Sequence, residues 1–141
     1  MSKASFEDII NRDGRLIYTN VGDSMSPLIR EGKDLLMIVK PEGRLKKYDI
    51  PLYKRDNGRY VLHRILKVRE DDYIICGDNR WNKEYGISDK HIIGVLKFVI
   101  RDGVEMPLSG FKYHCYVFLW CNLFPLRAFI LRVKSFIRRR L

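Results

Sequence analysis

The sequence predicts a mainly β domain with a short helix before it and an apolar, basic helix after it. Three observations support this fold class. Between Arg15 and about Ile100, short runs rich in aliphatic, aromatic and β-branched residues alternate with turn residues. The N-terminal residues carry a helix-capping pattern, and residues 111–141 contain no acidic side chain. At 141 residues the chain is long enough for one domain with a hydrophobic core.

The first predicted element is a short N-terminal helix within residues 1–14. Ser5 is followed three residues later by Asp8, which is the spacing of a capping box at the start of an amphipathic helix. The stretch contains acidic residues and only short apolar pieces, so it lacks the apolar core of a secretory signal peptide.

The predicted β domain spans residues 15–106. Asp56-Asn57-Gly58 predicts a tight hairpin, because Asn-Gly supplies the positive φ angles of such a turn. Lys40-Pro41-Glu42-Gly43 predicts a second turn. The candidate strands are Leu16–Tyr18, Leu35–Val39, Ile50–Lys54, Tyr60–Val68, Tyr73–Cys76 and Ile92–Ile100.

The C-terminal segment, residues 111–141, is predicted to associate with membrane lipid, after a Pro-Leu-Ser-Gly linker at residues 107–110. It holds seven of the 27 Lys and Arg residues and none of the 17 acidic residues. Pro125 and Arg127 interrupt its apolar run. Both a short or kinked span over residues 112–131 and a helix lying in the membrane interface are therefore open, beside a helix packed on the β domain.

An apolar stripe beside a basic face suits an anionic lipid surface, and the aromatic and aliphatic density of the tail argues against a nucleic-acid partner. The apolar side chains of this stripe recur at intervals of three and four residues and are Leu123, Leu126, Ile130, Val133 and Ile137. The three cysteines (Cys76, Cys115 and Cys121) lack metal-site spacing, so we expect no disulfide framework, no metal and no cofactor.

The segment Gly22-Asp23-Ser24-Met25-Ser26-Pro27 is the first candidate for chemistry. A glycine before Ser24 and a proline after it favour a fixed, non-helical loop. In such a loop a serine hydroxyl is exposed and backbone N–H groups can hold a developing oxyanion. By itself, such a segment is more often simply a turn.

His63 lies alone within the apolar run from Tyr60 to Val68. Alternation along a strand places it on the same face as Val61 and Ile65. A buried histidine is usually a hydrogen-bonded core group. However, an imidazole held on a rigid strand is also what a general base requires.

The polar loop from Cys76 to Gly86 offers two carboxylates, Asp78 and Glu84. Either of them would orient the His63 imidazole and stabilise its cation. An ordinary polar turn is the alternative interpretation of this loop.

Taken in order, these segments resemble the signal peptidase I family of serine peptidases. Ser24-Met25-Ser26-Pro27 is similar to the Ser-Met-x-Pro nucleophile box of the family. Val61–Ile65 is similar to the strand that carries the base, and Gly77-Asp78-Asn79 to the Gly-Asp-Asn box. The resemblance covers about residues 18–100. It implies an antiparallel β-sheet domain and a serine endopeptidase that cleaves signal or leader peptides.

The pair His63-Arg64 resembles one subgroup, the endoplasmic-reticulum and archaeal type, whereas typical bacterial members use a lysine base. In that subgroup a third acid follows the Gly-Asp-Asn box. Glu84 has the similar position here, although it is one methylene longer than the usual aspartate. The resemblance therefore favours Glu84 as the orienting acid, with Asp78 shaping the loop.

Two features depart from the family. The usual N-terminal transmembrane anchor is not expected, and Gly22 stands where bacterial members often have a hydroxyl residue that helps the oxyanion hole. Two alternatives stay open. One is a self-cleaving regulator similar to LexA-type peptidases, with Lys67 or Lys54 as base, and the other is a non-catalytic peptide-binding module. We expect a membrane-associated protein, with the side of the membrane open.

Overall fold

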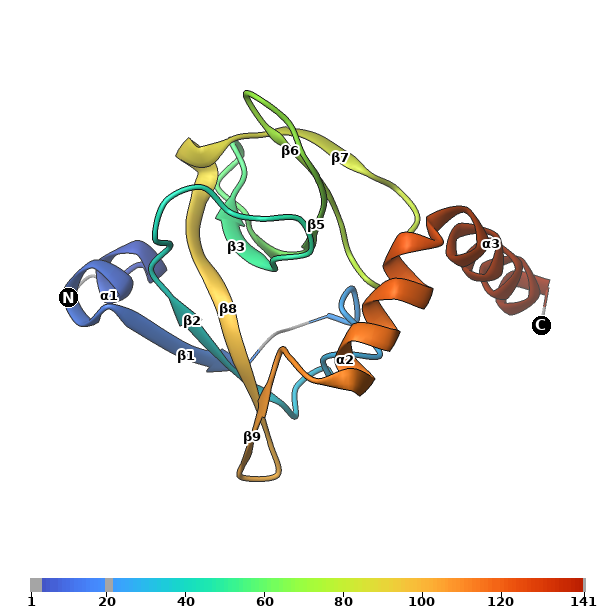
Figure 1. Cartoon of the computed structure of the whole chain (residues 1–141), viewed down its shortest axis with the longest axis horizontal. Coiled ribbons are helices and arrows are strands. Elements are labelled where there is room, and N and C mark those ends of the chain that lie inside the picture. The colour runs from blue at the N-terminus through green and yellow to red at the C-terminus, as the bar shows by residue number, and fades with distance from the viewer. Residues whose placement is uncertain (1–3, 20–21, 141) are drawn as a thin grey trace.

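The protein is mainly β, as the sequence predicts: two antiparallel sheets form a curled half-barrel, with a helix at each end of the chain (Figure 1). The computed structural model describes residues 4–19 and 22–140, so residues 1–3 and 141 of the two predicted end segments lie outside it. The strands are β1 (Arg15–Thr19), β2 (Leu35–Val39), β3 (Pro51–Lys54), β4 (Tyr60–Leu62), β5 (Arg64–Val68), β6 (Tyr73–Cys76), β7 (Glu84–Ile87), β8 (Ile92–Arg101) and β9 (Val104–Pro107).

The larger sheet has the strand order β1-β2-β8-β3-β4, and β9 pairs with β8. The smaller sheet has the order β5-β6-β7. A 3₁₀ turn, η1 (Asp89–His91), leads from the smaller sheet into β8, the long strand that crosses the molecule in Figure 1. The predicted hairpin at Asp56-Asn57-Gly58 is confirmed: it joins β3 to β4, and Gly58 has a φ of 88°.

Helix α1 (Phe6–Asp13) confirms the predicted N-terminal helix. The Ser5 side chain accepts a hydrogen bond from the Asp8 backbone, and the Asp8 side chain accepts one from the Ser5 backbone, so the capping box is complete. The helix ends at Gly14, whose φ of 77° lies in the left-handed region that favours glycine. Ile10 is the buried residue of α1, and it joins the core beneath the larger sheet.

Two hydrophobic clusters form the core. The larger one packs side chains of the larger sheet against α1 and against Met25 and Ile29, which come from the loop after β1. The smaller one packs Ile65, Tyr73, Ile75 and other side chains against one another at the smaller sheet. Tyr53 of β3 also packs in the smaller cluster, so β3 contributes to both sides of the half-barrel.

The predicted single strand from Tyr60 to Val68 is wrong at its centre. The chain leaves the larger sheet after Leu62 and enters the smaller sheet at Arg64, so His63 lies at the seam between the two sheets. Arg64 and Ile65 are adjacent and both buried, so the expected alternation of faces is broken there. The physical reason is that sheets curl around a core at corners where strands change sheet through a bend.

Two strands were not predicted, because neither has a strong hydrophobic pattern. Only one residue of β7, Ile87, is buried, and every residue of β9 is exposed. Glu84 therefore begins a strand, whereas the sequence places it in a loop. Pro107, the first residue of the predicted linker, ends β9.

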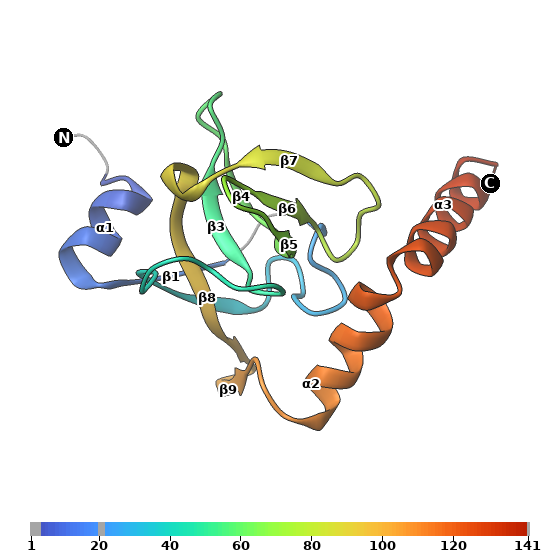
Figure 2. The ribbon, with the colours of Figure 1, turned by 45° about the horizontal axis from the view of Figure 1, so that its top comes forward.

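The C-terminal helices are α2 (Phe111–Tyr116), the π-helical turn η2 (Val117–Asn122) and α3 (Phe124–Arg140). A bend of 77° separates the first two from α3, so that α3 turns away from the sheets (Figure 2). Pro125 stands in the first turn of α3, where its missing N–H is tolerated. Among the described residues, neither helix alone has the length and apolar character for crossing a bilayer, whereas the bent pair together meets these two criteria.

Candidate active site

Ser24 lies in a turn between β1 and β2 that is anchored in the hydrophobic core by its neighbouring residues. The neighbouring Met25 is buried in the core with 1% of its surface exposed, and Ile29 is buried beside it. Backbone hydrogen bonds from Ser26 to Asp23 and from Ile29 to Met25 close the turn. Ser24 is therefore a partly exposed residue on a fixed loop, as a nucleophile requires.

The Gly-Asp-Asn loop (Gly77–Asn79) packs directly on the Ser24 turn. The Asn79 backbone N–H donates to the Ser24 carbonyl oxygen at 2.8 Å, and the Asn79 side-chain amide donates to the Asp23 carbonyl at 3.2 Å. The Asp78 backbone N–H points at the Met25 sulfur at 3.4 Å. Segments more than 50 residues apart in the sequence are thus joined into one unit.

Gly77 is the point where Ser24 and His63 approach each other. A Cβ atom on Gly77 would lie 2.6 Å from the Ser24 carbonyl oxygen and 3.1 Å from His63 Nε2. Because Gly77 has no side chain, the Nε2 edge of the imidazole and the Ser24 turn can both pack against it.

The opposite edge of the imidazole faces Tyr53 and Glu84. The Tyr53 hydroxyl lies 3.4 Å from His63 Nδ1 and donates a hydrogen bond of 2.6 Å to Glu84 Oε1. Because the hydroxyl proton is directed at the carboxylate, the phenol oxygen is free to accept a hydrogen bond from Nδ1–H. This chain favours the tautomer that leaves Nε2 unprotonated and facing Gly77 and Ser24.

Glu84 is held in this position by Arg55. The guanidinium makes two hydrogen bonds to the carboxylate, of 2.9 and 3.0 Å, and the pair is partly buried. Burial raises the pKa of Glu84, but the hydrogen bonds from Arg55 and Tyr53 outweigh it, and the pKa is below its ordinary value. The acid that the resemblance favours is therefore ionised at neutral pH and reaches the imidazole through Tyr53 instead of directly.

The pKa of His63 is lowered to about 4, first by burial and then by the charge of Arg55, while the charge of Glu84 opposes the shift. Arg80 lowers the pKa further, and Asp78 opposes this effect. The imidazole is therefore neutral at pH 7 and has a lone pair available at Nε2, but at rest it is a weak base. Stabilisation of its cation depends first on the Glu84 carboxylate and then on Asp78.

Asp78, the second candidate acid, is engaged elsewhere. Its carboxylate accepts two hydrogen bonds from Arg64, at 2.9 and 3.0 Å, and both side chains are completely buried. The Tyr116 hydroxyl donates to the same carboxylate at 2.8 Å. The structure thus brings Glu84 to the imidazole and places Asp78 in the support of its own loop.

The C-terminal helices complete that support. Trp120 Nε1 donates to the Asp78 carbonyl at 2.6 Å, and the Tyr113 hydroxyl lies 2.8 Å from Arg64. Arg127 is buried and donates to the carbonyl oxygens of Gly77 and Arg80, at 2.5 and 2.9 Å. Residues after the predicted linker therefore hold the loop that separates Ser24 from His63.

Sequence reasoning missed four residues of this site: Tyr53, Arg55, Gly77 as a spacer, and Arg127. A signal exists for two of them. Tyr53 follows two apolar residues in a predicted strand, and a buried tyrosine hydroxyl needs a partner. Arg127 interrupts an apolar run, where a buried cation needs acceptors. Arg55 and the spacing at Gly77 depend on contacts between strands, which the sequence does not encode locally.

Comparison of the chain with protein-family models, with curated proteins and with solved structures finds no match in any of the three. Within residues 4–19 and 22–140, no group of three or more His, Cys, Asp or Glu side chains is arranged to hold a metal ion. The chemistry that the described geometry supports is proton transfer by an oriented, neutral imidazole next to a serine turn.

Removing one member of the Arg64–Asp78 pair should destabilise the fold strongly. Asp78→Ala leaves the Arg64 cation buried without its carboxylate, and the expected loss in the free energy of unfolding is about 3–5 kcal/mol. Urea unfolding measures this loss. Arg12→Ala, which removes an exposed ion pair with Asp13, is the matched control and should leave the midpoint unchanged. Equal, small effects of both variants would contradict the assigned role of the buried pair.

The free energy of unfolding should rise with pH between about 4 and 6.5, the lowered and the ordinary pKa of His63. In this window the unfolded chain binds a proton at His63 that the folded protein does not bind, so stability falls as the pH is lowered. Urea unfolding across the window should show a smaller rise for His63→Gln than for the wild type. Identical pH dependence of the two proteins would show that His63 is not buried in its neutral form.

Proposed function

We propose that the protein is a serine endopeptidase in which Ser24 is the nucleophile and His63 is the general base. One observation carries the proposal. The His63 imidazole is placed between the Ser24 turn, on its Nε2 side, and the Tyr53–Glu84 hydrogen bond, on its Nδ1 side. A base that is oriented by a third group and lies next to a serine on a fixed turn is the arrangement of nucleophilic catalysis.

In the proposed reaction, His63 Nε2 takes the proton of the Ser24 hydroxyl while the oxygen bonds to the carbonyl carbon of the scissile peptide. The tetrahedral intermediate collapses when the imidazolium gives this proton to the leaving amine, and the acyl group stays on Ser24 as an ester. Water then attacks the ester, with Nε2 again as base, and releases the second product and the free serine. General-base assistance of this kind contributes about 10²–10⁴-fold.

Tyr53 and Glu84 are positioning residues in this mechanism. When His63 becomes a cation, Nδ1–H can donate to the Tyr53 oxygen, whose own proton is bound by Glu84. The negative charge of Glu84 then stabilises the imidazolium across two hydrogen bonds, in a partly buried site where such interactions are stronger than in water. Gly22 provides no hydroxyl for the oxyanion, so backbone N–H groups, including that of Ser24, would hold it.

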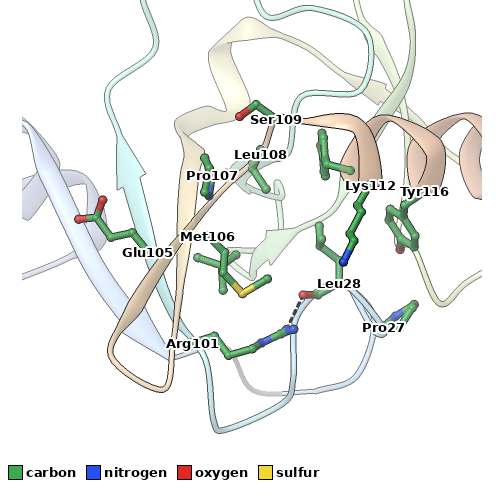
Figure 3. Close-up of a pocket in the computed structure, with 12 residues that line it drawn as sticks. Pro27, Leu28, Arg101, Glu105, Met106, Pro107, Leu108, Ser109, Lys112 and Tyr116 are labelled. Atoms are coloured by element: carbon green, nitrogen blue, oxygen red, sulfur yellow. Dashed lines mark hydrogen bonds between the residues drawn. The ribbon is translucent and has the colours of Figure 1, made fainter.

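The proposed substrate is an extended peptide, such as the end of a signal or leader peptide, as the family resemblance implies. An apolar groove with a volume of about 420 Å³ supports a peptide with an apolar portion. It lies between β9, α2 and the end of the Ser24 turn, and Pro27, Leu28, Met106 and Leu108 are among its lining residues (Figure 3). Ser24 and His63 do not line this groove, which begins at Pro27, three residues after Ser24. A substrate held there would have to extend from the groove to Ser24.

Ser24→Ala should abolish cleavage without loss of stability, because the substitution removes the nucleophile from a partly exposed turn. The test is incubation of the purified chain with a panel of leader peptides, with products identified by mass spectrometry. Ser26→Ala is the matched control, since Ser26 is two residues away and, among the described residues, its hydroxyl donates to the nearby Ile29 carbonyl.

Cleavage that persists in Ser24→Ala would rule out this mechanism. Peptides that bind the wild-type chain and are not cleaved would favour the non-catalytic binding module. A purified chain that cuts only itself would favour a self-cleaving regulator.

Gly77→Ala should lower kcat/KM by about 100-fold or more, because the added methyl group must displace the Ser24 backbone or the His63 ring. Misplacement of reacting groups by about 1 Å is sufficient for an effect of this size. The measurement is steady-state kinetics on a peptide from the panel, with urea unfolding to verify that the variant is folded. A folded Gly77→Ala variant with wild-type kinetics would contradict the shared contact of Ser24 and His63.

A further inference from the structure

Exposed apolar side chains are concentrated on the C-terminal helices. Of the fourteen large hydrophobic side chains that are exposed in the described part of the chain, nine lie between residues 111 and 137. Phe111 and Phe129 are the most exposed of these nine, at 84% and 65%. The nine side chains are Phe111, Phe118, Leu119, Leu123, Leu126, Phe129, Val133, Phe136 and Ile137.

Helix α3 has two distinct faces. Its inner face, which contains Arg127, Ala128 and Leu131, is buried. The outer face is exposed, and its residues recur every three or four positions, so they lie on the opposite side of the helix. We define the outer face as Leu126, Phe129, Val133, Phe136 and Ile137.

Cations border the outer face. By their positions along the helix, Arg132 and Arg139 are on one side of it and Lys134 is on the other, and all three are exposed. Arg140 lies at its C-terminal end, with its guanidinium 4.8 Å from the Phe136 ring centre. Residues 111–140 contain no acidic side chain. Long basic side chains can extend past an apolar face and place their charges at the level of lipid phosphates.

We propose that the outer face of α3 lies in the headgroup region of an anionic lipid bilayer, with the helix axis parallel to the membrane surface. The apolar side chains would enter the boundary of the acyl chains, and the flanking cations would bind the phosphates. This assignment is independent of the peptidase proposal.

The surroundings of Arg127 favour this arrangement over a spanning one. Arg127 donates to the Gly77 and Arg80 carbonyl oxygens and to the Cys76 sulfur, and its guanidinium lies 4.8 Å from the Phe124 ring centre. A span through residues 112–131 would move this cation from its acceptors into hydrocarbon, which is unfavourable. The 77° bend between the helices is kept when α3 lies on the surface.

The charges beside the outer face favour an anionic lipid over a second copy of the chain or a nucleic acid. A second copy of the chain would bring two sets of cations together, with no acidic side chain on either C-terminal segment to compensate them. A nucleic acid would satisfy the cations but would leave the five apolar side chains of the outer face in water. An anionic bilayer satisfies both the charges and the apolar surface.

The experiment is flotation of the full chain with vesicles of phosphatidylcholine alone and with vesicles that also contain phosphatidylglycerol. We expect binding to the anionic vesicles, weakened by high salt because the phosphates and cations are then screened. Phe129→Ser combined with Val133→Ser should lower the affinity by about tenfold or more, through loss of buried apolar area. Arg132→Gln combined with Arg139→Gln should lower it by a similar factor.

Val104→Ser is the matched control, since Val104 is 63% exposed on β9 and lies outside the C-terminal helices. Its affinity should equal that of the wild type. Ser24→Ala should also bind normally, so a failure of the peptidase proposal does not affect this test.

Three results would overturn the proposal. Equal binding to neutral and anionic vesicles would remove the role of the cations. Binding that resists both high salt and an alkaline wash would indicate a spanning segment. A dimer in sedimentation velocity that Phe129→Ser dissociates, together with no vesicle binding, would assign the outer face to a second copy.

Discussion

The buried ion pair between Arg64 and Asp78 is the interaction on which the rest of the structure depends. Both side chains are removed completely from solvent, so each charge requires the other. Removing one partner of such a pair is far more destabilising than replacing both by apolar residues. The remaining charge would stay buried without compensation in a medium of low polarity. The pair also joins three regions: the first residue of β5, the Gly-Asp-Asn loop, and α2 through Tyr113 and Tyr116.

This arrangement explains how a small protein can hold the proposed site on loops. The Ser24 turn is fixed by Met25 in the core, and the Gly-Asp-Asn loop is fixed by the ion pair. The hydrogen bonds between the two loops therefore form at little cost in conformational entropy. Pre-organisation of this kind is what general-base catalysis requires, since the reacting atoms must already be near their final positions. The C-terminal helices are a third support, because Tyr116, Trp120 and Arg127 donate hydrogen bonds to the Gly-Asp-Asn loop.

The sequence predicts well what depends on neighbouring residues. The capping box at Ser5, the hairpin at Asn57-Gly58 and most strands follow from local patterns, and the mainly β fold follows from their sum. What the sequence does not predict depends on closure in three dimensions. His63 leaves the expected strand because the half-barrel bends there, and Tyr53 meets Glu84 only after β3 and β7 are placed on opposite sides of that bend. Arg127 finds its acceptors 47 and 50 residues away.

The position of His63 at the seam between the sheets has a consequence for partly folded forms of the chain. Its preceding residue belongs to one sheet and its following residue to the other, while Ser24 and Glu84 approach it from opposite sides. Local opening of either sheet would therefore separate the site before the other sheet unfolds. If the proposed function is right, nascent or damaged chains would be inactive, and activity would report that both sheets have closed.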